Sequence, residues 1–146
     1  MYETIQSLHS YWAFLVLFIL IIATVNAIYK SATGKEYKAT DFRLSLFTLI
    51  VSHIQLLMGL LLYFVSPRLQ LFGEIGMGAI MKDPVSRLYL VEHPLVNIIA
   101  IALITIGYSK HKKKLTSSAK LKKIAIFYTL GLVLLLSRIP WSTWLS

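Results

Sequence analysis

The chain has 146 residues, of which 57% are hydrophobic and 14% charged, and its mean hydropathy is +0.70. A soluble domain usually has about a quarter charged residues, so this composition excludes a disordered chain and argues against a water-soluble globule. The sequence has no cysteine, which excludes disulfides, thiolate metal sites, Cys-ligated iron–sulfur clusters and covalent haem attachment through a C-x-x-C-H motif. The net charge is +9, and the meaning of this excess depends on where the charges lie between the apolar runs.

Four apolar segments predict an all-α fold, an integral membrane four-helix bundle that forms one transmembrane domain over residues 1–146. About 20 apolar residues cross a hydrocarbon core of ~30 Å as a helix, and the first three segments reach that length. The fourth is shorter, but Pro140, Trp141 and Trp144 extend it with an interfacial anchor. The expected helices cover about 8–29, 42–65, 85–108 and 124–139.

Capping and helix-breaking residues mark several of the expected boundaries. Asp41 is expected to cap the second helix, and Asp83 followed by Pro84 is typical of the start of the third. The loop at 66–83 contains apolar residues between glycines, which predicts a segment that lies on the membrane surface. Pro94 lacks a backbone donor and should bend or restart the third helix beside His93.

The positions of Lys and Arg predict the orientation of the bundle. The loops at 30–41 and 109–123, together with Arg43, hold 11 of the 15 basic residues. By the positive-inside rule both loops are cytoplasmic, and both termini and the 66–83 loop lie on the outer, periplasmic side of a bacterial inner membrane. The lysine run could instead bind lipid or nucleic acid, but we prefer to interpret it as a topology signal and expect no nucleic-acid partner.

Histidines within the apolar segments are the first candidates for function, because ionisable side chains are costly in lipid. His53 lies near the middle of the second segment, His93 in the outer part of the third, and His9 at the outer start of the first. At about 1.5 Å per residue, His53 and His93 differ in depth by about one helical turn. His111 lies in the lysine run, and we expect it to be solvated.

Two stripes of small or polar residues at alternating spacings of three and four predict inward helix faces. One stripe is on the third helix and consists of His93, Asn97, Ala100, Ile104 and Gly107. The other is on the second helix, beside His53, and consists of Ser45, Thr48, Ser52, Gln55 and Gly59. Such faces allow a flat cofactor to approach, although close packing of helices uses small residues in the same way.

Two neutral imidazoles from adjacent helices can ligate the iron of a six-coordinate b-type haem. His53 and His93 are the expected haem-iron ligands, with His9 as the alternative. Cofactors of this kind are often held between the facing helices of a bundle. Haem propionates attract cations, and Arg138 and Arg87 lie towards the same outer side.

Other interpretations of the same residues stay open. Glu92 and His9 could exchange protons or bind a quinol, and together with His93 they could bind copper. The methionines that could add soft ligands, or simply fill space, are Met58, Met77 and Met81. The histidines could also only tie helices together in a cofactor-free assembly or scaffold subunit. The sequence has no Ser-His-Asp set and no H-E-x-x-H motif, which favours an electron-transfer protein over a stand-alone enzyme.

Most of the chain resembles small four-helix bacterial membrane proteins usually labelled cytochrome b-like. The resemblance rests on L-H-S-Y-W at 8–12, the D-F-R to V-S-P stretch at 41–67, the V-E-H-P to Y-S-K stretch at 91–110, and S-R-I-P-W-S at 137–142. It implies non-covalent haem and electron transfer, with His53 and His93 as ligands and His9 as a third participant. The expected partners are the lipid bilayer, a quinol as electron donor, and a larger membrane complex or a second copy of the chain.

Overall fold

The computed structural model describes residues 1–144, and nearly all of them are helical, which confirms the predicted all-α class. The long helices are α1 (Tyr2–Thr33), α2 (Ala39–Val65), α6 (His93–Lys112) and α7 (Ser117–Ser137). The short ones are η1 (Pro67–Gln70), α3 (Leu71–Glu74), α4 (Gly76–Lys82), α5 (Pro84–Arg87), the π-turn η2 (Leu88–Glu92) and α8 (Trp141–Trp144).

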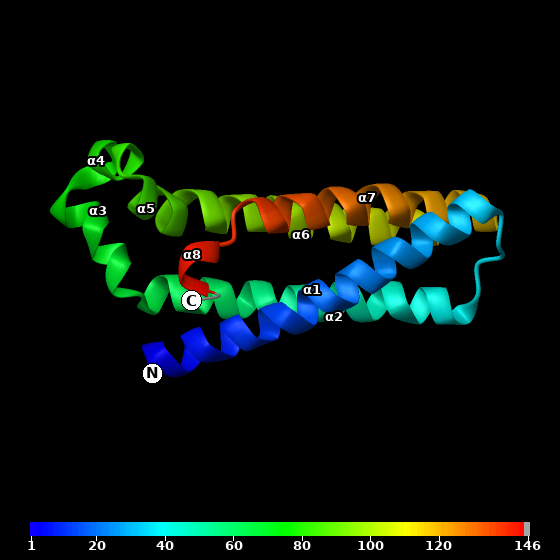
Figure 1. Ribbon diagram of the computed structural model, residues 1–146, viewed down its shortest axis with the longest axis horizontal. Helices are drawn as coiled ribbons and strands as arrows, with labels where there is room; N and C mark the ends of the chain where they lie inside the picture. The colour runs from blue at the N-terminus through cyan, green and yellow to red at the C-terminus, as the bar shows by residue number, and fades with distance from the viewer. Residues whose placement is uncertain (145–146) are drawn as a thin grey trace.

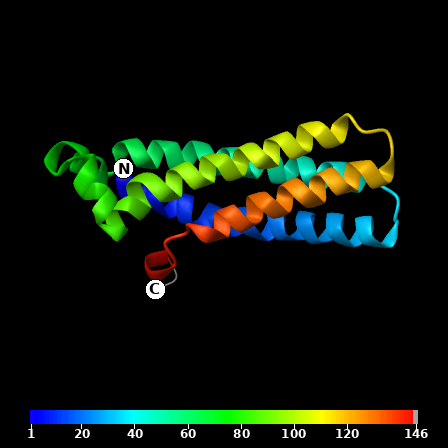
Figure 2. The ribbon, with the colours of Figure 1, turned by 90° about the horizontal axis from the view of Figure 1, so that it is seen from above.

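The four long helices lie side by side and form a closed ring of neighbours (Figures 1 and 2). Helix α1 packs against α2 and α7, and α6 packs against the same two helices. The turns between α1 and α2 and between α6 and α7 lie at one end, which we call the hairpin end (Figure 1). The N-terminus, the short helices η1 to α5 and α8 lie at the other end, which we call the terminal end (Figure 1).

The helix boundaries follow local stop and start signals, but the helices are longer than the apolar segments. Helix α1 ends where Gly34 adopts φ +67°, a conformation that favours glycine, and its N–H bonds to Lys30 O. Helix α7 begins at Ser117 rather than near residue 124, because the Thr116 side chain caps it by accepting a bond from Ala119 N. The 66–83 loop is not irregular but is folded largely into η1, α3 and α4.

The predicted start of the third segment is confirmed in detail. The Asp83 carboxylate accepts bonds from the Ser86 backbone and hydroxyl, and Pro84 occupies the first turn of α5. The hydrogen bond from Ser86 holds the pKa of Asp83 below its ordinary value. The helix then widens into the π-turn η2 before α6 starts at His93.

The core has a polar side and an apolar side. Apolar and small side chains of α1, α6 and α7 form one cluster, which consists of Leu20, Ala23, Ala27, Ala100, Ile104, Ile124, Tyr128 and Leu135. Helices α6 and α7 approach closely at Gly131, where a Cβ atom would lie 2.7 Å from Cγ1 of Ile104. Helix α2 instead buries Ser45, Thr48 and Ser52 of its predicted stripe.

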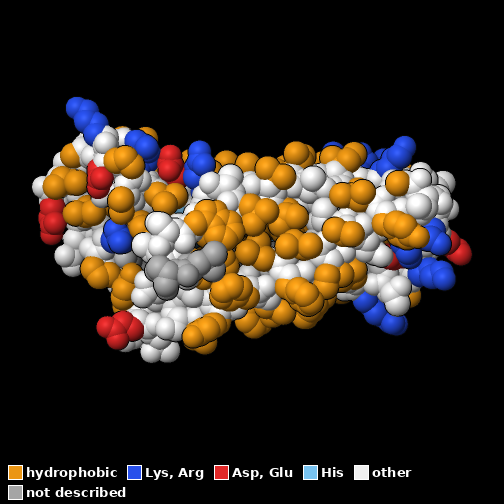
Figure 3. Space-filling model, in the orientation of Figure 1, with side chains coloured by type: hydrophobic (Ala, Val, Ile, Leu, Met, Phe, Trp, Pro, Cys, Tyr) orange, Lys and Arg blue, Asp and Glu red, His pale blue; other side chains and the backbone are white. Residues whose placement is uncertain are grey.

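The outer surface of the bundle is apolar. Large side chains such as Phe18, Leu57 and Val133 are more than half exposed. Figure 3 shows an orange belt across the middle of the molecule, with Lys and Arg side chains gathered at its two ends. Within residues 1–144, three helical stretches are long and apolar enough to cross a membrane, namely Tyr2–Thr33, Ala39–Val65 and Pro84–Lys112. These features are those of a membrane protein.

Candidate functional site

His9 and His93 meet inside the bundle at the terminal end. His9 comes from the first turns of α1 and His93 from the start of α6, and their ring centroids are 6.3 Å apart with nearly perpendicular planes. Gly59 of α2 lies against the His9 ring, where a Cβ atom would be 3.1 Å from Cε1. The missing side chain at Gly59 therefore leaves the room that the His9 imidazole occupies.

The backbone of the α7 C-terminus fixes the orientation of the His93 ring. Its Nδ1 lies 2.8 Å from the Arg138 carbonyl oxygen, and because a carbonyl only accepts, Nδ1 carries the proton. The lone pair of the neutral ring is therefore on Nε2. The amide nitrogen of Asn97 lies 3.1 Å from both ring nitrogens and so beside the ring, not specifically on Nε2. A histidine whose Nδ1–H donates to a backbone carbonyl has the arrangement of a metal-ligating imidazole.

Three buried polar atoms around this pair have no hydrogen-bond partner among residues 1–144: His9 Nδ1, Gln55 Oε1 and Asn97 Oδ1. The Gln55 amide nitrogen donates to the His9 carbonyl at 2.9 Å, so Gln55 is tied to the same site. An unpaired buried polar atom costs about 1–3 kcal/mol, and native structures rarely tolerate several together. The His9–His93 cluster, defined as His9, Gln55, His93 and Asn97, thus has unused bonding capacity for a ligand or ordered water.

Charged residues lie at the rim of this cluster. Glu92 is half-buried between two arginines, with its carboxylate 3.2 Å from Arg87 Nε and 3.9 Å from Arg138 Nε. Two guanidinium groups beside one carboxylate leave one positive charge in excess. The structure therefore places both arginines beside Glu92, the residue before His93, and this carboxylate matches part of their charge.

The π-turn before His93 has a clear cause. Pro94 has no N–H to donate to the carbonyl of Leu90, one turn earlier. The Tyr63 hydroxyl of α2 donates to this carbonyl at 2.9 Å instead. The predicted helix restart at Pro94 is confirmed, and the contact with α2 holds His93 in position.

The structure does not bring His53 and His93 together. His53 is on the exposed side of α2, and its Nε2 lies 2.9 Å from the Thr105 hydroxyl. Thr105 is twelve positions after His93 on α6, or about 18 Å along the helix axis. Helix rotation explains the exposed position of His53: Ser52 points inward, and the next residue on the helix is turned by about 100°.

The sequence carries a signal about the orientation of His53. Gln55 and Gly59 belong to the predicted inward stripe of α2, whereas His53 lies beside that stripe. The stripe therefore counts against an inward-facing His53, but it does not select His9 as the partner of His93. The sequence does not give the relative position of α1 and α2. In the structure, contacts such as the hydrogen bond from Trp12 Nε1 to Val51 O at 2.9 Å define it.

His111, which we expected to be solvated, is fully buried. Its Nε2 lies 3.0 Å from the Tyr37 hydroxyl, and its ring packs among Tyr37, Phe42 and Tyr108. The Tyr37 backbone N–H also donates to Ser117 Oγ at 3.0 Å. Burial, with the nearby Asp41 charge and Tyr108, raises the pKa of Tyr37 to about 12. These contacts close the hairpin end.

The fold and the site together describe an all-α protein with three helices able to span a membrane and an interior histidine pair. No family model, curated protein or solved structure matches the chain. The resemblance to cytochrome b-like proteins therefore stays an expectation. Within residues 1–144 no group of three or more His, Cys, Asp or Glu side chains is placed to hold a metal ion, which gives the copper alternative no support.

Proposed function

We propose that the protein is a multi-pass protein of the bacterial inner membrane that holds a b-type haem by His9 and His93 and transfers electrons. The observation that carries this proposal is the pair of imidazoles that meet inside the bundle, 6.3 Å apart between ring centroids. Bound haem supplies a one-electron redox couple, and the chain supplies its ligands and surroundings.

The residues at the site fit this group. The Arg138 carbonyl holds the His93 tautomer that leaves Nε2 as a ligand. The missing side chain at Gly59 leaves room for the His9 ring against α2, and the unpaired oxygens of Gln55 and Asn97 provide polar contacts. In this proposal the excess positive charge around Glu92 attracts the propionates.

The proposal includes the four-helix membrane arrangement with both termini on the periplasmic side. The concentration of 11 of the 15 Lys and Arg residues at 30–43 and 109–123 supports this orientation. A membrane quinol is the proposed electron donor, with Glu92 as the group that exchanges its protons at the terminal end. In this proposal the electrons pass on to a larger membrane complex or to a second copy of the chain.

A visible spectrum of the full chain tests the haem proposal. The protein is expressed with added haem, purified in mild detergent, and measured oxidised and then reduced with dithionite. We expect a sharp Soret band and an α-band on reduction, because two imidazoles make the iron six-coordinate. His9→Ala and His93→Ala should each abolish these bands, whereas His53→Ala should leave them unchanged.

Two outcomes would contradict the proposal in different ways. A colourless wild-type protein would remove haem altogether. Bands that disappear in His53→Ala and His93→Ala but persist in His9→Ala would keep the haem and overturn the ligand assignment. Metal analysis of the same sample decides the copper alternative.

A cofactor-free scaffold is the second candidate, because each of these histidines also joins two helices. His53 bonds to Thr105 of α6, His93 bonds to Arg138 at the end of α7, and Gln55 bonds to the His9 carbonyl. In a scaffold these hydrogen bonds contribute only stability, of about 0.5–1.5 kcal/mol each. The colourless outcome above would favour this candidate.

A further inference from the structure

One face of α2 carries buried polar side chains along most of the length of the bundle. Asp41, Ser45, Thr48 and Ser52 follow at spacings of four, three and four, and they are 5%, 1%, 0% and 0% exposed. Gln55 continues the same face into the His9–His93 cluster. A helix in lipid would normally bury aliphatic side chains here, so this face needs an explanation.

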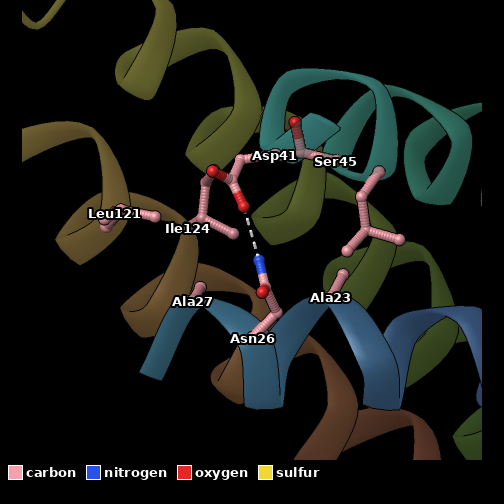
Figure 4. Close-up of a pocket in the computed structure, with 8 residues that line it drawn as sticks. Ala23, Asn26, Ala27, Asp41, Ser45, Leu121 and Ile124 are labelled. Atoms are coloured by element: carbon pink, nitrogen blue, oxygen red, sulfur yellow. Dashed lines mark hydrogen bonds between the residues drawn. The ribbon is translucent and has the colours of Figure 1, made fainter. Parts of the chain in front are cut away.

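At the hairpin end the face begins beside a small water-sized cavity. The Asp41 carboxylate accepts bonds from Lys30 Nζ at 2.6 Å, Asn26 Nδ2 at 2.7 Å and the Lys38 backbone at 2.8 Å. Next to it lies a cavity of about 10 Å³, bordered by Asn26, Asp41 and Ser45 and otherwise by apolar side chains (Figure 4). This volume is roughly what one water molecule needs.

In the middle of the bundle two kinds of hydroxyl occur. Ser45 and Thr48 donate to carbonyls of their own helix, Phe42 O and Leu44 O, both at 2.8 Å, as serines and threonines in membrane helices commonly do. Ser52 is fully buried, yet its Oγ has no partner within the described part of the chain. This unpaired hydroxyl lies between the bonded hydroxyls of α2 and the unpaired Gln55 oxygen, and one bound water would satisfy it.

The spacing of these side chains along α2 suits a continuous row in which side-chain polar groups alternate with water molecules. Successive positions three or four residues apart are about 4.5–6 Å apart along the axis, a gap that a single bridging water spans. This row of polar groups runs from Asp41 to Gln55, whose amide nitrogen donates to the His9 backbone carbonyl at the His9–His93 cluster. Each hydroxyl or water can accept a proton on one side and release one on the other, so transfer along it needs no other reactant.

We propose that this polar file on α2, defined as Asp41, Ser45, Thr48, Ser52 and Gln55, conducts protons between the hairpin end and the His9–His93 cluster. This inference goes beyond the electron-transfer proposal and does not depend on it. The file uses hydroxyls that a haem site does not need, and it would operate with or without bound haem.

Proton flux into lipid vesicles tests the file. The full chain is reconstituted into phosphatidylcholine–phosphatidylglycerol vesicles that enclose a pH-sensitive dye, and a potassium gradient with valinomycin supplies the driving force. We expect acidification several-fold faster than in protein-free vesicles. Ser52→Val and Thr48→Val should return the rate to that of empty vesicles, because methyl groups replace the hydroxyls and exclude water.

Matched variants separate the file from a general leak. Thr48→Ser keeps a hydroxyl at position 48 and should keep the proton flux. Thr105→Val makes the same substitution as Thr48→Val, but at a threonine outside the file, and it should also keep the flux. The proposal is overturned if the wild type is no faster than empty vesicles, or if folded Ser52→Val and Thr48→Val, checked by circular dichroism, conduct as the wild type does. It is also overturned if Thr105→Val stops the flux as completely as Ser52→Val.

Discussion

At the scale of single residues, two features position the histidine pair. One is a hydrogen bond to a backbone carbonyl, and the other is a missing side chain beside the His9 ring. Pro94 leaves the Leu90 carbonyl without its helical donor, and Tyr63 supplies one from a different helix. Gly59 supplies empty space where any other residue would meet His9. Tyr63 and Gly59 therefore help to decide where the two imidazoles lie.

Removal of the Tyr63 hydroxyl should weaken the fold near His93. We expect Tyr63→Phe to lower the free energy of unfolding by about 1–3 kcal/mol, because it leaves the buried Leu90 carbonyl unpaired. Denaturant unfolding in mild detergent measures the change. Tyr29→Phe, at a ring that is 55% exposed, is the control and should change stability by less than about 0.5 kcal/mol. Equal stability of the two variants would show that another donor serves Leu90.

A methyl group at Gly59 should displace His9. The added Cβ in Gly59→Ala would lie 3.1 Å from the His9 ring, tight enough that the ring must move. We expect less haem per protein in pyridine haemochrome analysis than in the wild type. Gly73→Ala is the matched control, because nothing lies within 4 Å of its Cβ, and it should keep the haem and gain up to about 1 kcal/mol from helix propensity. Unchanged haem content in Gly59→Ala would argue against His9 as a ligand.

At the scale of elements, the two helical hairpins are held together at the hairpin end by aromatic and polar contacts. Tyr37, in the turn between α1 and α2, bonds to His111 of α6 and to Ser117 of α7. A partly buried ion pair between Lys30 and Asp41 joins α1 to α2 in the same region, with a Nζ–Oδ2 distance of 2.6 Å. The basic end of the bundle is therefore ordered by specific contacts as well as by apolar packing.

Truncation of His111 tests this closure. We expect His111→Ala to lower the free energy of unfolding by about 2–4 kcal/mol, because it opens a cavity and leaves buried polar groups of Tyr37 and Tyr108 without their partner. Lys113→Ala is the nearby exposed control and should stay within about 0.5 kcal/mol of the wild type. A stability loss as small as that of the control would mean that His111 is solvated after all.

At the scale of the whole molecule, an apolar belt separates a strongly basic hairpin end from a terminal end of mixed charge. This asymmetry predicts one orientation in the membrane, with the hairpin end in the cytoplasm. The absence of cysteine from the sequence makes the orientation directly measurable, because any introduced thiol is unique.

Thiol labelling of intact cells checks the orientation. In cells with a permeabilised outer membrane, a membrane-impermeant maleimide should label Glu74→Cys at the terminal end and leave Lys113→Cys at the hairpin end unlabelled until the cells are lysed. The side chains at both positions are exposed, so access to the reagent depends on the membrane alone. The opposite labelling pattern would reverse the proposed topology and place the His9–His93 cluster near the cytoplasm.

Much of the architecture could be predicted from local patterns. The long apolar runs indicate membrane-spanning helices, and Asp83, Pro84 and Pro94 mark helix starts that the structure confirms. The inward stripe of α2 is buried at Ser45, Thr48 and Ser52, as its spacing predicts. These features depend on residues close together in the chain, so helical geometry and hydrophobicity are enough to determine them.

The sequence by itself therefore determined the helices, their apolar character and the faces they turn inward. Only the tertiary structure decided that His93 lies beside His9 rather than His53, and that His111 is buried rather than solvated. Both outcomes depend on how far one helix slides and rotates against another. That register results from side-chain contacts between residues far apart in the chain, such as Trp12 with Val51 and Tyr37 with His111, and the periodicity of a single helix carries no information about it.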